Sequence, residues 1–368
     1  MNNNRHYYRH IQKSLLQLYP QKQLNGHQVR HLNTLAAMIS GIVRGKSCQL
    51  EKIARKVPDK TQVESRVKRF SRVLKHETIT PELFFLPFIL PLLAGLASSG
   101  LITLAMDGSE TGRHCLTLMV SVIYRKRAIP IAWIVKKGGK GHLAEDVHLE
   151  LLDKVSQILP KGCQVVFLGD GEFDGIDLQA ALAKLGWKYV VRTAKNTIVF
   201  DDQDEFSLKD VGLTRGELLE IPDVELTRSR YGLVTVLIWW DQAYDKPIYL
   251  VTNMACSEEA CAYYRRRFRI ETFFSDQKSR GFNLHKSHQA DTTRLKRLLI
   301  PACLAYIWMI FLGEMVEQDT AVMKQIHRAD RCDLSLFQLG LRYLEYLLNY
   351  DLRIPIDFIL PGIMKCVR

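Results

Sequence analysis

Residues 101–136 read LITLAMDGSETGRHCLTLMVSVIYRKRAIPIAWIVK, and their pattern sets the expected fold. They contain three runs rich in apolar and β-branched residues, at 101–106, 114–124 and 128–136, joined by short polar links. Such runs between turn residues are typical of strands, and the short links favour antiparallel pairing. We therefore predict three consecutive antiparallel strands, the first of which ends immediately before Asp107.

Helices and strands alternate after these three runs. The predicted helices are 142–159 and 177–186, and the predicted strands are 164–169 and 187–193. Short, right-handed connections favour one mixed sheet in which the first and fourth strands are parallel neighbours. Ligands of such sheets bind beyond the carboxyl ends of the strands, where the strand order reverses. We therefore expect Asp107 and Asp170 to lie close together at that edge.

The rest of the chain divides into regions of different pattern. Residues 194–246 break the alternation with β-like runs and polar loops, and 247–252 resumes it as a strand. A long helix is predicted from about Ser257, and the tail from Arg294 is mostly helical. For this α/β protein we predict a helical basic region over 1–80, a core over 81–195 and 247–312, a β-rich insertion over 196–246 and a helical C-terminal region over 313–368.

One apolar run, from Leu83 to Met106, is long enough to cross a membrane. Pro87 and Pro91 interrupt helical hydrogen bonding, and the Ser-Ser-Gly sequence at 98–100 is a turn signal. We therefore predict a buried helix, a turn and a buried strand here, and no membrane span.

Positive charge is concentrated near the N-terminus. The formal net charge is +12, and residues 1–76 hold 16 Lys and Arg against 3 Asp and Glu. Clustered cations release counterions when they contact phosphates, so this distribution indicates nucleic-acid binding. Residues 30–76 show two helical patterns around a turn, which fits a helix-turn-helix reader of double-stranded DNA. The second helix carries Arg66, Lys68, Arg69 and Arg72. A helical hairpin with a solvated basic surface is the alternative.

The eight cysteines form no C-x-x-C pair and are scattered along the chain. This pattern indicates buried free thiols in a reducing compartment and argues against a zinc site. The N-terminal residues lack an apolar signal core, so we expect a cytoplasmic protein.

Residues 262–281, AYYRRRFRIETFFSDQKSRG, are predicted to form a helix with one charged face. At helical spacing, the four side chains of this face lie within a stripe about 60° wide and about 20 Å long. They are Tyr264, Arg267, Glu271 and Lys278. A carboxylate flanked by cations suits a metal ligand beside a phosphate backbone. The alternative is a solvated face with pairs of opposite charge.

Glu271 would complete a set of three carboxylates with Asp107 and Asp170. Mg²⁺ and Mn²⁺ prefer such hard oxygen ligands and keep water molecules for exchange with phosphate oxygens. Two such ions can activate a nucleophile and stabilise the leaving oxygen of a phosphoryl transfer. An Asp that follows a strand is more often a loop or cap residue, and this remains the alternative for each Asp taken alone.

The spacing Tyr264-x₂-Arg267-x₃-Glu271-x₆-Lys278 resembles the Y-R-E-K signature of the insertion sequence 4 family of DDE transposases. The segments DGSETGR at 107–113 and LGDGEFDG at 168–175 are similar to the two Asp motifs of that family. The resemblance covers roughly residues 30–350. It implies a ribonuclease-H-like core that is interrupted by a β-rich insertion.

The resemblance also implies an activity and a role for each matching residue. The implied ligands of two Mg²⁺ ions, for which Mn²⁺ substitutes, are Asp107, Asp170 and Glu271. The implied binders of phosphates at the transposon end are Tyr264, Arg267 and Lys278. Family chemistry is nicking at the inverted repeats, hairpin formation, and joining of the 3′ ends to target DNA by a homodimer. We therefore expect a bacterial, nucleoid-associated protein with no small-molecule cofactor beyond the metal.

The sequence departs from this family at one position. Better-known relatives place a Trp, which stacks on a flipped base, in the strand before the signature helix. Here that position is close to Ile248, beside Tyr249. Trp239 and Trp240 in the insertion are alternative stacking platforms, and simple core packing is the other interpretation of both.

Two other functions remain open at this stage. A DNA-binding relative that has lost catalysis would share the fold, although the intact set of carboxylates argues against it. A metal-dependent hydrolase of small phosphates would share the metal site, but the basic N-terminal region argues against that function.

Overall fold

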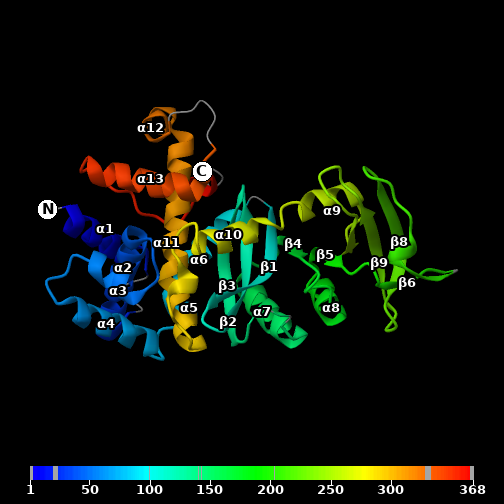
Figure 1. Cartoon of the computed structure of the whole chain (residues 1–368), viewed down its shortest axis with the longest axis horizontal. Coiled ribbons are helices and arrows are strands. Elements are labelled where there is room, and N and C mark those ends of the chain that lie inside the picture. The colour runs from blue at the N-terminus through cyan, green and yellow to red at the C-terminus, as the bar shows by residue number, and fades with distance from the viewer. Residues whose placement is uncertain are drawn as a thin grey trace.

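The computed structural model describes residues 3–19, 24–98, 100–139, 141, 143–202, 204–327 and 333–364. A sheet occupies the centre of the molecule (Figure 1). The N-terminal helices lie at one end of the long axis, and the β-rich insertion lies at the other. Helix α11 (Thr292–Gln318) passes between the N-terminal helices and the sheet, and packs against α2, α4 and β3.

Five strands form the part of the sheet that carries the candidate site. They are β1 (Leu101–Gly112), β2 (Cys115–Tyr124), β3 (Arg127–Lys137), β4 (Gln164–Gly169) and β5 (Lys188–Thr193). Their order is β3-β2-β1-β4-β5. β1 and β3 are antiparallel to β2, whereas β1, β4 and β5 are parallel. The predicted mixed α/β sheet is confirmed. Consecutive residues 102–106 are all buried, so both faces of β1 are covered.

Strand β1 continues beyond its predicted end at residue 106. Asp107 lies within the strand and pairs with Met119 of β2. The parallel register joins Ala105 to Leu168, and two further residues along each chain place Asp107 level with Asp170. β4 ends at Gly169 and its pairing with β1 stops at Ala105, so β2 is the only described strand that pairs with β1 from Asp107 onward. Residues 107–110 of this extension are half-buried, whereas residues 102–106 are buried.

Helices cover the sheet and connect its strands. α7 (Glu145–Ile158) joins β3 to β4, and α8 (Ile176–Lys184) joins β4 to β5. α7 packs against β2, β3 and α8. α9 (Ser257–Tyr264) packs against β4 and β5, and α10 (Arg269–Gln277) crosses β1, β2 and β3.

The insertion adds strands to the same sheet. They are β6 (Ile198–Phe200), β7 (Glu205–Ser207), β8 (Leu218–Leu226) and β9 (Tyr231–Trp239), with a short 3₁₀ helix η2 (Leu208–Asp210) after β7. β10 (Ile248–Thr252) lies between β5 and β9 and is antiparallel to both. The sheet therefore has ten strands among the described residues, in the order β3-β2-β1-β4-β5-β10-β9-β8-β6-β7.

The N-terminal region is helical, as the sequence predicts. Its helices are α1 (Asn3–Leu18), α2 (Gly26–Gly45), α3 (Leu50–Lys56), α4 (Val63–Lys75), α5 (Pro81–Phe84) and α6 (Leu86–Ala97). α3 and α4 are the two predicted helices around a turn, and α6 ends at Ala97 before β1 begins at Leu101. The apolar run from Leu83 to Met106 is therefore divided between helix and strand, as predicted.

The C-terminal region comprises α11, α12 (Thr320–Ile326), α13 (Leu336–Asn349) and α14 (Pro361–Met364), and a 3₁₀ helix η3 (Leu284–Lys286) precedes it. α11 alone among the described helices is long and apolar enough to cross a membrane, but 94% of its apolar window is buried inside the protein. It is a core helix. The predicted domain boundary after residue 312 falls inside α11, so the structure shows no division there.

Candidate active site

Asp107 and Asp170 face the same edge of the sheet from neighbouring strands. The N–H of Gly108 donates to Oδ1 of Asp107 at 2.8 Å, and the N–H of Glu172 donates to Oδ1 of Asp170 at 3.0 Å. Burial raises the pKa of Asp107 to about 7, and the charge of Asp170 adds to this effect. Two carboxylates that repel each other in this way would be stabilised by a cation.

The predicted single helix over the signature residues is interrupted. α9 ends at Tyr264 and α10 begins at Arg269, with a turn at 265–268. The turn is held by bonds of 3₁₀ type, in which each N–H donates to the carbonyl three residues earlier, as from Arg267 to Tyr264 and from Glu271 to Phe268. The helix is therefore not continuous between Tyr264 and Glu271, so the straight stripe predicted from uninterrupted helical spacing is wrong.

Arg267 joins carboxylates from two elements. Its guanidinium donates from Nη2 to Oε1 of Glu271 at 2.6 Å, and its Nη1 lies 3.9 Å from Oδ2 of Asp170. The side chain of Arg267 is 15% exposed, whereas that of Glu271 is 55% exposed. The charge of Arg267 lowers the pKa of Asp107 and the charge of Glu271 raises it, so all three carboxylates share one electrostatic environment.

The other two residues of the signature lie around this group. Lys278 follows the last residue of α10, outside the helix, and its Nζ donates to Oγ of Ser109 on β1 at 2.6 Å. The ring of Tyr264 is buried and lies 5.9 Å from the guanidinium of Arg267. The structure therefore brings all six predicted site residues to one edge of the sheet, although Lys278 reaches it through β1.

The side chains of this group are chemically suited to a divalent cation, but their present arrangement does not form a metal site. Within the described residues, no three His, Cys, Asp or Glu side chains are placed so that they could hold a metal ion. The predicted cage of Asp107, Asp170 and Glu271 is therefore not assembled here, because Glu271 is bonded to Arg267. The donors are nevertheless the hard oxygens that Mg²⁺ prefers, and a cationic side chain already lies against two of them.

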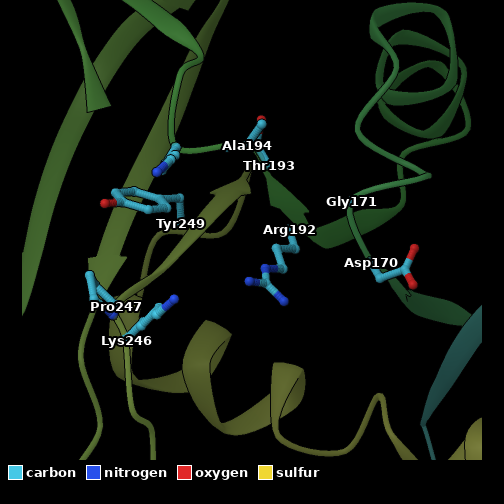
Figure 2. A pocket seen from close by; sticks show the side chains of 9 residues that line it. Asp170, Gly171, Arg192, Thr193, Ala194, Lys246, Pro247 and Tyr249 are labelled. Carbon is cyan, nitrogen blue, oxygen red and sulfur yellow. The ribbon is translucent and has the colours of Figure 1, made fainter. Parts of the chain in front are cut away.

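A pocket of about 540 Å³ opens beside Asp170 (Figure 2). Its lining is Asp170, Gly171, Arg192, Thr193, Ala194, Lys195, Lys246, Pro247 and Tyr249. The side chains of Arg192 and Lys246 extend into the space between Asp170 and Tyr249. Sequence reasoning did not identify Arg192, Lys195 or Lys246. One signal was available, since Arg192 is an exposed charge near the carboxyl end of an otherwise mostly buried strand.

The two predicted aromatic platforms lie within the insertion and are already engaged. The ring of Trp239 is buried, with the guanidinium of Arg265 at 4.7 Å and the ring of Tyr244 at 5.3 Å. The indole N–H of Trp240 donates to the carbonyl of Tyr244 at 3.1 Å. Trp239 therefore serves core packing in this structure, and Tyr249 is the aromatic residue that lines the pocket.

The four predicted DNA-binding cations of α4 differ in their surroundings. Arg66 is buried and donates to the carbonyl of Val57, and Arg69 forms an ion pair with Asp59 at 2.9 Å. Lys68 and Arg72 are exposed. Arg66 and Arg69 thus stabilise the turn between α3 and α4, while Lys68 and Arg72 present charge to solvent.

The sequence matches one family model, and the fold is similar to a solved structure. The family model described as "Transposase DDE domain" matches residues 103–308, which is more than half of the chain. No match was found among curated proteins. Among solved structures, the chain is similar to piggyBac transposase in a synaptic complex with hairpin DNA, at 11% identity and a TM-score of 0.43, over 96% of this chain and 80% of that chain. The family match runs from β1 to α11 and includes all three carboxylates. The chain therefore belongs to the transposase DDE domain family.

Proposed function

We propose that this protein is a transposase that cuts DNA at the inverted-repeat ends of a transposon and joins the 3′ ends to target DNA. The observation that carries the proposal is the arrangement of Asp107, Asp170 and Glu271, which come from three separate elements and share the environment of one guanidinium. These carboxylates would hold two Mg²⁺ or Mn²⁺ ions. When bound, such ions activate the attacking hydroxyl and stabilise the leaving oxygen.

The cations of the site position the DNA backbone in this proposal. Arg267 can donate two parallel hydrogen bonds to one phosphate, and Lys278 acts as a point charge fixed by Ser109. The phenol of Tyr264 lies beside Arg267 and completes the group. A hairpin intermediate needs a sharply bent strand, whose crowded phosphates these charges would neutralise.

The pocket beside Asp170 would hold one nucleotide of the bent strand. Its volume of about 540 Å³ exceeds what a single base needs, and Tyr249 offers an aromatic face for stacking. Arg192, Lys195 and Lys246 supply positive charge for the adjoining phosphates. A base displaced from the duplex would relieve the crowding of the hairpin turn.

Recognition of the transposon ends is assigned to the helical basic region. The exposed side chains of Lys68 and Arg72 lie on one helix, α4, outside the catalytic sheet. We further propose that two copies act on paired ends, as a homodimer on bacterial DNA. End binding would then belong to the predicted domain over 1–80, and catalysis to the core over 81–195 and 247–312. The insertion over 196–246 would support the DNA strand, and the region over 313–368 would pair the two copies. Helix α11 would be shared between this last region and the core.

The proposal is tested by incubating the full chain with labelled duplexes that carry the inverted repeats flanking its own gene. We expect nicks at the repeat ends in Mg²⁺ or Mn²⁺ and no nicks in Ca²⁺. Specific binding without cleavage would instead indicate a catalytically silent relative. Hydrolysis of a small phosphate ester without duplex binding would indicate a hydrolase, and either result would overturn the proposal.

Replacing both Lys68 and Arg72 with alanine should weaken binding to duplex DNA and reduce its salt dependence. Each lost phosphate contact lowers the slope of log K against log salt by about one unit. Binding is measured by fluorescence anisotropy between low and moderate salt. Substitution is preferable to deletion of residues 1–76, because α2 and α4 pack against the core helix α11. The matched double variant is Lys161→Ala with Lys184→Ala, which removes two exposed charges outside this region. Equal slopes for both double variants would show that α4 does not contact DNA.

Replacing Ser109 with alanine should slow strand cleavage about tenfold, because a hydrogen bond to a charged group is lost and Lys278 becomes free to move. Ser109→Thr, which retains the hydroxyl, should restore most of the rate. Single-turnover cleavage of labelled ends measures the effect. The control is Ser279→Ala, which removes an exposed hydroxyl beside Lys278. A normal rate for Ser109→Ala would show that Lys278 needs no such support.

A further inference from the structure

The loop that carries Asp170 is held by α7 and by the residues that precede that helix. The ring of Phe173 is fully buried and lies 4.8 Å from the ring of His148 on α7. Glu145, at the start of α7, accepts a hydrogen bond from the N–H of Leu178 at 2.8 Å. A side chain at Gly175 would meet the carboxylate of Glu145 at 2.0 Å, so the loop approaches α7 as closely as its backbone allows. The position of Asp170 therefore depends on α7.

Glu172 is the residue of this loop that connects α7 directly to Asp170. Its backbone N–H donates to Oδ1 of Asp170 at 3.0 Å. Its side-chain Oε1 accepts from the N–H of Leu143 at 2.9 Å. Its Oε2 lies 3.9 Å from the point that a Cβ on Gly108 would occupy, beside the backbone that follows Asp107. Glu172 thus connects the segment before α7 to Asp170 and lies beside the backbone of Gly108.

His148 lies on the other side of this carboxylate. Its Nε2 is 3.6 Å from Oε1 of Glu172, and the side chain is almost fully buried. That nitrogen has no hydrogen-bond partner among the described residues, so it is placed toward Glu172 and held there by ring packing on Phe173. The side chain of Glu172 is itself only 17% exposed. Its direction is therefore set by the backbone of Leu143 and by the imidazole of His148.

We propose that Glu172, oriented by Leu143 and His148, is a positioning residue that fixes the carboxylate of Asp170 for metal binding. With Oδ1 of Asp170 held by the N–H of Glu172, the second oxygen, Oδ2, faces Arg267 and the shared site. Loss of the side-chain anchor would release the loop and let Asp170 rotate. The inference rests on the proposed function, because that function assigns Asp170 as a metal ligand.

Two substitutions separate the reach of this side chain from its charge. Glu172→Gln keeps the length and a carbonyl oxygen that can accept from Leu143, but removes the charge. Glu172→Asp keeps the charge but is one methylene shorter, which withdraws the acceptor from Leu143. A positioning residue needs the reach, whereas a direct metal ligand needs the charge.

Mn²⁺ binding to the full chain provides a measurement that does not depend on catalysis. Free Mn²⁺ is followed by electron paramagnetic resonance as the protein is titrated, and Asp170→Ala gives the background. We expect Glu172→Ala and Glu172→Asp to weaken binding about 10- to 100-fold, as for other residues that orient metal ligands. Glu172→Gln should stay close to the wild type. Glu150→Gln, which neutralises an exposed acid of α7, should leave binding unchanged.

Cleavage of labelled ends by the same variants should follow the same order. Binding that is retained by Glu172→Asp and lost by Glu172→Gln would overturn the inference in favour of direct ligation. Unchanged binding in all three Glu172 variants would overturn it as well, while leaving the proposed function intact. If the wild-type protein binds no more Mn²⁺ than Asp170→Ala does, this result would overturn the proposed function itself. The Gln and Asp variants decide the question even where Glu172→Ala lowers the thermal stability of the protein.

Discussion

Alanine at Asp107, Asp170 or Glu271 should abolish strand cleavage while leaving duplex binding within about twofold of the wild type, because the proposed function assigns DNA affinity mainly to cations outside this group. Removing one ligand takes away the charge stabilisation of the phosphoryl-transfer transition state, so we expect the rate to fall at least about a thousandfold. Single-turnover cleavage of labelled ends in Mg²⁺ measures the loss. Anisotropy with the same duplexes in Ca²⁺ measures binding.

The effect should be as large for Glu271 as for the two aspartates, although the side chain of Glu271 is 55% exposed and that of Asp170 is 35% exposed. In the present arrangement its carboxylate is bonded to Arg267, so an exposed salt bridge is the competing interpretation of this residue. Such a pair contributes little to stability or activity, and its loss would change the cleavage rate only slightly. Glu259→Ala, which removes an exposed acid from α9, is the matched control. A rate near that of this control would show that Glu271 is not a ligand.

The order and direction of the core strands could be predicted because local pattern and connection length determine them. Residues 101–136 contain three apolar runs with short links, and short links leave antiparallel pairing as the simplest arrangement. The proximity of Asp107 and Asp170 follows from the same rule, since parallel neighbours end at the same edge of a sheet. The prediction placed Asp107 after β1 rather than within it, because the polar run 107–112 gives no sign that β2 pairs with it.

The break between α9 and α10 could not be predicted in the same way. Residues 265–268 are RRRF, which contain neither Gly nor Pro, and any periodicity argument assumes a straight helix. The turn is produced by tertiary packing, because α9 packs against β4 and β5 whereas α10 crosses β1 to β3. Lys278 leaves the predicted helix face for a separate reason, because α10 ends at Gln277 and the Nζ of Lys278 donates to Oγ of Ser109.

The pocket beside Asp170 is the part of the site that lay furthest beyond sequence reasoning. Arg192 and Lys246 are more than 50 residues apart, and strands β6 to β9 lie between them in the sequence. They meet because β10 returns to pair with β5 after β6 to β9 have extended the sheet. A contact of this kind depends on a long loop closure, for which a single sequence carries no local signal.

Alanine at Arg267 or Lys278 should separate the first step of the reaction from the later ones. Neither cation can hold Mg²⁺, so first-strand nicking should fall by no more than about tenfold for either variant, the effect of one charged hydrogen bond. Hairpin formation brings phosphates of one strand close together, and their repulsion must be offset by fixed charge. We therefore expect hairpin and joined products to fall at least about a hundredfold for Arg267→Ala, which would lose the two parallel bonds to phosphate proposed for this guanidinium.

Denaturing gels of labelled ends, sampled over time, resolve nicked, hairpin and joined products of each variant. Arg266→Ala is the matched control, because it removes an exposed guanidinium from the same turn. The guanidinium of Arg266 lies over the ring of Tyr263 at 5.0 Å. Arg267 also lies against Asp170 and Glu271, so its loss could disturb the carboxylates themselves. That case would appear as an equal loss of every product, nicks included, and would assign Arg267 to the support of the metal ligands. Lys278 contacts Ser109 at 2.6 Å, and a selective loss of hairpins in Lys278→Ala would show that phosphate binding is the shared role of the two cations.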